Sequence, residues 1–500
     1  MTNYRWAITG LLFFSVAINY MDRQVLSLTW KDFIAPEFHW TNNDYGTITG
    51  LFSIFYAVCL LFAGRFVDWI DTKKGFLWAI GIWSVGAVLH AFCGIATSGI
   101  TAGRWLVGFE EARKLIGTVD DIGMVTSVSV TLFIFARFVL ALGEAGNFPA
   151  AIKTTAEYFP KKDRAFSTSI FNSGAQIGAL IAPISIPAIA AKWGWEMAFL
   201  AIGAIGFIWM GFWIFMYKKP HVHPLVNKAE LEYINQDTIA ETKANNNVEV
   251  KEKKIPFLKA FGYRQTWAFA FGKFMTDGVW WFYLFWTPAY LSDVYGLTSD
   301  TTMAKTLIFV LYAIVMLSII GGWLPKYFVD KLGMNPYAGR MRAMLIFAFL
   351  PLLALLAQPL GHTSYWFPVI IIGIACAAHQ AWSANLFSTI GDMFPKSAIA
   401  TITGIGGMAG GFGAFIINKG SGVLFDFASG TTMVDGKADV MTKELLAAGA
   451  QYITGPMKFF GFEGIRAGYF IVFCVCSVAY LIGWVVMKML VPKYKPIVVE

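Results

Sequence analysis

Two pairs of ionisable residues lie inside long apolar segments of the chain. Asp22 and Arg23 interrupt the first apolar segment, and Arg137 and Glu144 interrupt the fourth. Ionisable side chains are costly within a hydrocarbon layer, and they usually face a cavity or a proton path. A guanidinium can bind a carboxylate in a bidentate fork, and a carboxylic acid can take up and release a proton. These residue types suit the coupled binding of an organic anion and a proton.

The positions of these residues fit two helices. At ~1.5 Å per residue, Asp22 lies about 24 Å along a helix that begins at Trp6, which is within the membrane towards its outer side. Arg137 and Glu144 are two helical turns apart and share one face. In the alternative, purely structural interpretation, Asp22 pairs with Arg23 and Arg137 neutralises Glu144. We favour function, because the pairs lie in corresponding first and fourth helices.

The elements that hold these residues must be membrane-spanning helices. The chain has 500 residues, of which 57% are hydrophobic and 14% are charged, whereas soluble domains carry about 25% charged residues. Many apolar blocks reach or approach the ~20 residues that cross a ~30 Å hydrocarbon layer. This composition excludes soluble enzymes, nucleic-acid-binding proteins and secreted disulfide scaffolds. It predicts an all-α polytopic membrane protein.

Hydropathy predicts twelve transmembrane helices in two six-helix halves. The predicted spans lie near residues 6–29, 46–66, 76–97, 131–154, 166–190, 196–217, 266–291, 305–327, 343–360, 364–390, 398–424 and 466–489. A polar linker over 218–262 separates the half at 1–217 from the half at 263–500. We expect this linker to be cytosolic, flexible and partly helical, without a metal site at His221 and His223. The layout resembles that of major facilitator transporters, whose halves contain inverted three-helix repeats.

Loop charges predict that both termini are cytoplasmic. An even number of spans places both ends on one side, and Lys and Arg gather in the connections on that side. The connection between the last two spans is an exception, but it is long and also holds acidic residues. The first apolar run lacks a cleavage site, so we expect it to be a retained helix.

The connection between spans two and three resembles the signature loop of the major facilitator superfamily. Residues 64–75 read GRFVDWIDTKKG. Gly64 permits close helix approach, and Asp68 can cap a helix or pair with a cation when a cytosolic gate is shut. Lys73 and Lys74 would hold the loop on the cytoplasmic side, and a further glycine, Gly75, closes the motif. The alternative is an ordinary positively charged turn. The family usually has a glycine where Asp71 stands, so this turn departs from the pattern.

Five further strings resemble the anion:cation symporter family within that superfamily. They are NYMDR at 19–23, GEAGNFP at 143–149, FNSG at 171–174, WWFYLFW at 280–286 and HQAWSAN at 379–385. Within the family, the chain most resembles bacterial hexuronate transporters, which import galacturonate and glucuronate with protons. The resemblance covers almost the whole chain.

The resemblance implies roles at matching positions. Asp22 and Glu144 match the acids that take up and release the coupling proton, and Arg23 and Arg137 match the arginines that hold the substrate carboxylate. Hydroxyls, amides and tryptophan faces suit a sugar ring. The candidate substrate-binding residues of this kind are Tyr20, Tyr56, Asn172, Gln176, Trp280, Tyr283, His379, Trp382 and Asn385.

Some of these candidates have simpler interpretations. The aromatic run that contains Trp280 and Tyr283 can be an interfacial belt or bundle core, and His379 can be a satisfied polar residue. Lys273 and Asp277 lie four apart and can form an ion pair, which is most simply structural and alternatively part of a gate. The segment from Ser98 to Val130 is longer than is usual in the family. We expect a solvated loop there, or alternatively a cover over the external mouth or a contact with a periplasmic partner.

The sequence therefore predicts a proton-coupled hexuronate symporter of the bacterial inner membrane, working by alternating access as a monomer. We expect no catalytic residues, no metal, no nucleic-acid partner and no cofactor other than the coupling proton. The alternatives are the same mechanism with an aldonate such as galactonate, another sugar acid or an aromatic carboxylate. A transporter-like sugar-acid sensor and a facilitator without proton coupling are further alternatives.

Overall fold

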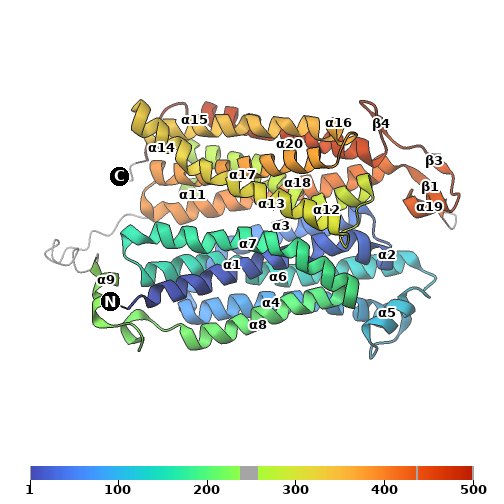
Figure 1. The fold of residues 1–500 in the computed structure, drawn as a ribbon, viewed down its shortest axis with the longest axis horizontal. Coiled ribbons are helices and arrows are strands. Elements are labelled where there is room, and N and C mark those ends of the chain that lie inside the picture. Colours follow the sequence, from blue (N-terminus) through green and yellow to red (C-terminus); the bar gives the residue numbers. More distant parts are fainter. Residues whose placement is uncertain (1, 237–256, 435–436, 498–500) are drawn as a thin grey trace.

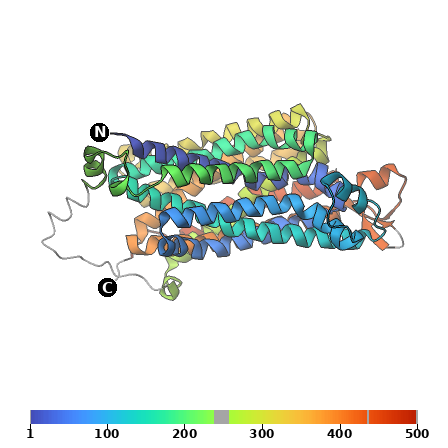
Figure 2. The same cartoon turned by 90° about the horizontal axis from the view of Figure 1, so that it is seen from below.

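The computed structural model describes residues 2–236, 257–434 and 437–497. It omits the side chains of residues 64, 65, 68, 161, 162, 165, 257, 319, 396, 397, 400, 437, 443 and 444. Long helices run side by side along the long axis of the molecule, and both termini lie at the same end (Figures 1 and 2). We call this the terminal end and the opposite one the distal end.

The long helices of the first half hold the charged residues of the predicted site. They are α1 (Tyr4–Thr29), α3 (Asn42–Ile70), α4 (Thr72–Ala102), α6 (Ile122–Tyr158), α7 (Lys161–Trp193) and α8 (Trp195–Met216). A π-helical turn η1 (Trp30–Ile34) and a short helix α2 (Ala35–Phe38) join α1 to α3, and α5 (Phe109–Ile116) lies between α4 and α6.

The second half contains both continuous and broken helices. Its continuous long helices are α12 (Arg264–Tyr295), α17 (Trp366–Met393), α18 (Lys396–Ser429) and α20 (Ile465–Leu490). Two others are broken helices, in which a 3-10 segment joins two α-helical parts. The first consists of α13 (Thr302–Val315), η3 (Met316–Ile319) and α14 (Ile320–Leu332). The second consists of α15 (Pro336–Phe349), η4 (Leu350–Leu356) and α16 (Ala357–Gly361). Prolines inside α14 and at the start of η4 remove backbone donors from these segments.

Ten helical segments of the described chain are long and apolar enough to cross a membrane, and each coincides with a predicted span. The other two predicted spans correspond to α1 and α12, which are also long. Both carry ionisable residues, among them Asp22 and Arg23 in α1 and Lys273 and Asp277 in α12. Such residues lower the hydropathy of a helix, and they mark functional positions in a membrane protein.

Small residues bring the helices of the first half close together. A Cβ atom at Gly178 of α7 would lie 2.3 Å from the backbone oxygen of Ala17 in α1. A Cβ atom at Gly143 of α6 would lie 2.3 Å from the backbone nitrogen of Trp83 in α4. These distances are too short for any side chain, so glycine permits close packing at both places. Because Gly143 directly precedes Glu144, this contact also fixes the site.

The described parts of the linker include three short helices. They are η2 (Pro220–Val222), α9 (Lys228–Ile234) and α11 (Phe257–Ala260). Glu230 of α9 is fully buried and forms a 3.1 Å ion pair with Arg5 at the start of α1. The guanidinium of Arg5 also lies over the ring of Tyr233. This part of the linker is therefore fixed to the first half.

A small β-structure caps the distal end between α18 and α20. A three-stranded sheet, ordered β2-β1-β3, contains β1 (Thr431–Val434), β2 (Lys437–Val440) and β3 (Tyr452–Thr454), and α19 (Lys443–Ala447) precedes β3. β1 pairs antiparallel with β2, with Thr431 opposite Val440. A hairpin of β4 (Lys458–Phe459) and β5 (Phe462–Glu463) then leads into α20.

The segment between α4 and α6 differs from the solvated loop that its mixed charge suggests. Its helix α5 buries Ala112 and Ile116, while Glu110, Glu111 and Lys114 remain exposed. The segment is thus an amphipathic helix docked on the distal end of the first half.

Candidate functional site

A buried ion pair joins α1 to α6. Nε of Arg23 donates to Oε2 of Glu144 over 2.6 Å, and the two side chains are 6% and 0% exposed. Within the described residues, this pairing replaces the structural alternative in which Arg23 neutralises Asp22 and Arg137 neutralises Glu144. Adjacent helical residues do not face each other, so Asp22 and Arg23 point in different directions. The pair therefore depends on how the two helices pack.

Three aromatic rings surround the guanidinium of Arg23. Its central carbon lies 4.4 Å from the ring centre of Tyr56, 5.2 Å from that of Trp281 and 5.4 Å from that of Tyr20. Tyr20 and Tyr56 are predicted pocket residues of the first half, whereas Trp281 comes from α12 in the second half. Trp281 is not among the pocket residues predicted from the sequence, although its neighbour Trp280 is. Arg23 therefore lies where the two halves meet, held by cation–π contacts.

The other two ionisable residues of the predicted site have unpaired polar atoms. All three guanidinium nitrogens of Arg137 and both carboxylate oxygens of Asp22 are buried without a hydrogen-bond partner, as is Oε1 of Glu144. Asp22 lies within electrostatic range of Glu144, Arg137 and Arg23. Buried polar groups are normally hydrogen-bonded, and exceptions are common at functional sites. Such a cluster can bind a carboxylate at the arginines and a proton at the acids.

A histidine that the sequence analysis did not select borders this cluster. His90 of α4 is fully buried, and its ring stacks on Phe199 of α8 at 4.8 Å. Nδ1 lies 2.7 Å from the backbone oxygen of Gly86, and Nε2 has no hydrogen-bond partner. Arg137 lies within electrostatic range of the ring. A single histidine in an apolar helix gives no signal in the sequence, because only packing brings it to Arg137.

The second half brings four aromatic and imidazole side chains together. Trp280 stacks on His379 at 5.3 Å, and Nδ1 of His379 lies 2.8 Å from the hydroxyl of Tyr480. Trp382 meets the ring of Tyr480 edge-on at 5.6 Å. Trp280, His379 and Trp382 are pocket residues predicted from the sequence, whereas Tyr480 is not. Nε1 of Trp382 is buried without a hydrogen-bond partner, and the hydroxyl of Tyr283 is buried against the thiol of Cys476.

The remaining pocket candidates have different surroundings. The amide of Asn385 donates to the backbone oxygens of Gly321 and Ala381, both at 2.8 Å, so it joins α17 to α14. On α7, Asn172 is exposed and Gln176 is half-buried. The structure thus gives Asn385 a contact that joins α17 to α14.

The predicted gating loop lies at the terminal end. The surroundings of Gly64 and the side chain of Asp68 are outside the part of the chain that the structure describes. Lys73 donates to the backbone oxygen of Ile214 over 2.8 Å, which ties the loop to α8. The side chain of Lys74 is exposed. A Cβ atom at Gly75 would lie 3.1 Å from Cα of Val67, so glycine permits the tight passage from α3 to α4.

Polar contacts join the two halves at the distal end. Asp426 of α18 accepts hydrogen bonds from the backbone nitrogens of Asn42 and Asn43 and from the Asn42 amide, at 2.8 to 3.0 Å. Asp32 of η1 accepts a hydrogen bond from the backbone nitrogen of Ser299 over 2.7 Å. Further contacts of this kind are Lys31–Asp293, Ser292–Asp32, Lys419–Thr47 and Tyr45 with the backbone oxygen of Phe285. The distal end is therefore closed by contacts between the halves.

A second ionic cluster anchors α5 to the distal end. Arg113 binds Glu37 of α2 at 3.1 Å and Glu196 of α8 at 2.8 Å, and Trp195 donates from Nε1 to Glu37 over 2.8 Å. Burial raises the pKa of Glu37 to about 7, although the bonds from Trp195 and Arg113 and the charge of Arg113 act in the opposite direction. Glu37 is thus an acid at the distal end whose pKa lies near neutral pH.

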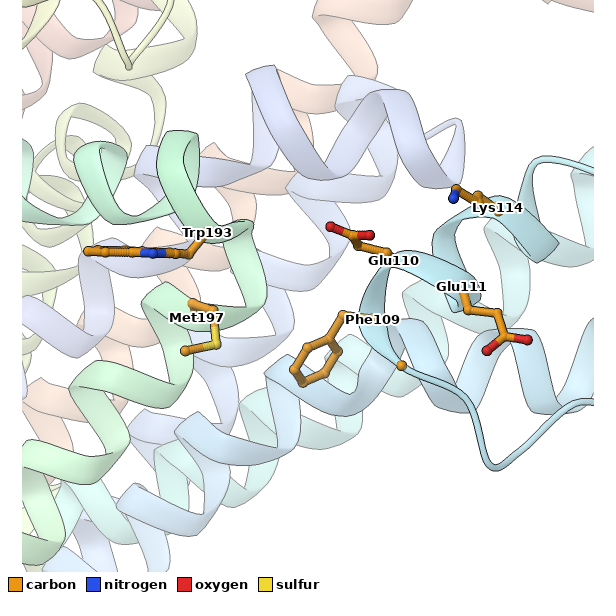
Figure 3. Close-up of a pocket in the computed structure, with 7 residues that line it drawn as sticks. Phe109, Glu110, Glu111, Lys114, Trp193 and Met197 are labelled. Carbon is orange, nitrogen blue, oxygen red and sulfur yellow. The ribbon is translucent and has the colours of Figure 1, made fainter.

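A shallow surface pocket beside α5 is separate from the buried charges. Figure 3 shows Phe109 and Glu110 of α5 facing Trp193 and Met197, which lie at the turn from α7 to α8. Its lining does not include any residue of the Arg23–Glu144 cluster. We therefore regard the buried cluster as the candidate functional site.

Comparisons with known proteins agree with this fold. The hexuronate transporter of Escherichia coli (strain K12) is 27% identical over 426 residues, which cover 84% of this chain and 88% of the relative. The galacturonate transporter of Dickeya chrysanthemi is 24% identical over 346 residues, with 69% and 88% covered. A bacterial homologue of the human lysosomal transporter Spinster, solved in an inward-facing and occupied conformation, has a similar fold. Its TM-score is 0.67 at 17% identity, with 99% of each chain covered.

The sequence profile of the Major Facilitator Superfamily matches residues 12–417. This match covers most of the chain, and the similar curated proteins are transporters of sugar acids. The predicted helical fold is confirmed, as is the expectation of a protein other than an enzyme. The chain belongs to the Major Facilitator Superfamily and is a multi-pass membrane transporter.

Proposed function

We propose that the protein is a symporter that imports a hexuronate with a proton across the bacterial inner membrane, as a monomer with cytoplasmic termini. The observation that carries the proposal is the buried Arg23–Glu144 pair, enclosed by aromatic rings from both halves and lying beside the unpaired Arg137. The similarity to hexuronate and galacturonate transporters supports the choice of substrate.

The ion pair provides a way to couple the proton to the substrate. A proton that binds Glu144 removes the charge that engages Arg23, and the guanidinium can then bind the carboxylate of the substrate. Conversely, a bound carboxylate weakens the attraction of Arg23 for Glu144 and so favours protonation. Each ligand therefore raises the affinity for the other, as linkage requires. Asp22 and Arg137 lie within electrostatic range and take part in the same balance.

Alternating access would carry the loaded site from one side to the other. The distal contacts between the halves hold that end closed, and their separation would open the site to the distal side. The rings of Trp280 and Trp382 and the hydroxyl of Tyr283 supply stacking and hydrogen-bonding groups for a sugar ring.

The test uses purified protein in liposomes that contain a pH-sensitive dye. Galacturonate, glucuronate and galactonate are added in turn, with wild type beside Arg23→Ala and Glu144→Gln. We expect internal acidification with a hexuronate, its absence with galactonate, and its loss in both variants. Acidification with galactonate alone would keep the mechanism but replace the substrate. Binding without any proton movement would reject the symporter and favour a sensor or an uncoupled facilitator.

A further inference from the structure

The second half has a buried ion pair that the cycle above does not use. Nζ of Lys273 lies 2.6 Å from Oδ2 of Asp277 in α12, and the two side chains are 8% and 14% exposed. The sequence predicts this pair as a structural one. However, a buried ion pair contributes little net stability, because desolvation offsets the attraction between the charges. Stability alone therefore gives weak grounds for two charges inside a membrane helix.

The surroundings of this pair combine a glycine, aromatic rings and a histidine. A Cβ atom at Gly410 of α18 would lie 2.3 Å from Oδ2 of Asp277, so glycine makes room for the carboxylate. Nζ of Lys273 lies 4.5 Å from the ring centre of Phe387, and His379 of α17 lies within its electrostatic range. Tyr480 of α20 lies within range of Asp277. The pair thus adjoins the Trp280–His379–Tyr480 cluster described above.

Trp281 connects this pair to the first one. It lies in α12 about one helical turn after Asp277, and its ring centre is 5.2 Å from the central guanidinium carbon of Arg23 in the other half. The two ion pairs therefore lie on opposite sides of the interface between the halves. Each consists of one cation and one acid, so protonation of the acid would free the cation in either half.

The formal charges of the two ion pairs and of Asp22 and Arg137 balance. They belong to three acids, Asp22, Glu144 and Asp277, and three cations, Arg23, Arg137 and Lys273. A substrate with one carboxylate that enters with one proton leaves this balance unchanged, and opening the Arg23–Glu144 pair is sufficient. A substrate with two carboxylates requires two protons, and the second half can provide the second acid and cation.

We propose that Lys273 and Asp277 form a second carboxylate subsite, through which the transporter also accepts sugar acids with a carboxylate at each end and moves them with two protons. This inference rests on the proposed function. One proton binds Glu144 and the other binds Asp277. Lys273 then leaves Asp277 and binds the second carboxylate, while the first carboxylate binds Arg23. Both protons leave with the substrate on the opposite side, so the core returns to its balanced state.

The test compares two substrates that differ in the oxidation state of carbon 1, and therefore also in whether the sugar can close into a ring. Galacturonate has one carboxylate, and galactarate is the same sugar oxidised to a carboxylate at both ends. Uptake of labelled substrate and proton movement are measured in liposomes that contain the full-length protein. The double variant Lys273→Gln/Asp277→Asn removes both charges at once, so no unpaired charge is left buried. The matched control is Lys458→Gln/Glu463→Gln, which removes an exposed ion pair at the distal end.

We expect wild type and the control to move one proton with galacturonate and two with galactarate. The double variant should lose at least tenfold in galactarate uptake and keep galacturonate uptake within about threefold. Equal losses for both substrates would show that the pair is structural and would overturn the inference. If wild type takes up galacturonate but not galactarate, the inference is overturned and the proposed function is left intact. Failure to move either substrate would reject the proposed function itself.

Discussion

Arg23 has two kinds of partner that place different demands on its side chain. Its Nε bonds the carboxylate of Glu144, while its planar face lies against the rings of Tyr20, Tyr56 and Trp281. A guanidinium can do both at once because it is flat and has donors along its edge. A lysine ammonium is a compact point charge and can satisfy one demand only at the expense of the other.

We therefore predict that Arg23→Lys lowers the affinity for galacturonate at least tenfold, which corresponds to about 1.4 kcal/mol. The affinity is measured from the rise in melting temperature of the purified protein as galacturonate is added. Arg104→Lys is the matched control, because Arg104 is exposed in the segment between α4 and α5. An Arg23→Lys protein with wild-type affinity would show that the fork and the stacking are unnecessary.

The sequence indicated which residues form the candidate site better than it indicated their partners. Asp22, Arg23, Arg137 and Glu144 stand out because charges are rare in apolar segments. Their pairing could not be predicted, because it depends on the rotation of α1 against α6. Trp281, which lies over Arg23, was missed for the same reason. The four consecutive aromatic residues at 280–283 look alike until the packing of α12 gives each a direction.

At the scale of the elements, the turn between α3 and α4 contains an unusual backbone. Asp71 has a φ of +92° and a ψ of 148°, a conformation that is essentially restricted to glycine. Its side chain compensates, because it accepts a hydrogen bond from the backbone nitrogen of Thr72 and lies 3.4 Å from Nζ of Lys219. Asp71 therefore differs from the glycine of the family pattern while keeping a backbone conformation that is typical of glycine.

This geometry predicts different stabilities for two small replacements of Asp71. Asp71→Ala keeps the backbone strain and loses the cap, whereas Asp71→Gly loses the cap but relieves the strain. We expect the glycine variant to be more stable than the alanine variant by about 1 to 3 kcal/mol. Thermal unfolding of both proteins in detergent measures the difference. A more stable alanine variant would mean that the turn adopts another conformation.

The docked helix α5 gives the distal end a titratable contact. The pKa of Glu37 is raised from its ordinary value of 4.5 to about 7, so folding favours its protonated form. The contribution of protonated Glu37 to the free energy of unfolding is complete below pH 4.5 and is lost as the pH rises through 7. The wild type should therefore lose stability between pH 5 and pH 8, by at most about 3 kcal/mol from this group.

Glu37→Gln tests this prediction, because glutamine does not titrate. Melting temperatures at pH 5 and pH 8 should differ less in the variant than in the wild type. Glu110→Gln is the control, since Glu110 is an exposed acid on α5. An unchanged difference in the Glu37→Gln protein would mean that another group dominates the pH dependence. This contact could not be predicted from the sequence, because the charges around α5 are typical of a solvated loop.

For the whole molecule, hydropathy located the long helices well. Each predicted span coincides with a long helix or a broken pair of helices, because about 20 apolar residues have few alternatives in a bilayer. What hydropathy could not predict is how the halves meet. The contacts of Asp426 with Asn42 and of Asp32 with Ser299 join residues that are far apart in the chain. Such contacts depend on the conformational state of the transporter as well as on its fold.

The carboxylate of Asp426 is central to these distal contacts. It accepts three hydrogen bonds from Asn42 and Asn43 at the start of α3, across the boundary between the halves. Its removal leaves buried donors unpaired, at a cost of about 1 to 3 kcal/mol each. That cost falls on the state in which the distal end is closed, because the contacts are broken when the halves separate there. A change of about 3 kcal/mol alters the ratio of two states by about a hundredfold.

We predict that Asp426→Ala shifts the population towards a distal-open state. Spin labels at Thr118 of the first half and Thr302 of the second, both exposed at the distal end, report this opening as a longer distance in pulsed electron resonance. The labels require a background in which the five native cysteines are replaced. Asp120→Ala is the matched control, because Asp120 is an exposed acid at the same end. An unchanged distance distribution in the Asp426→Ala protein would show that the apolar contacts between α3 and α18 close the distal end without help from these hydrogen bonds.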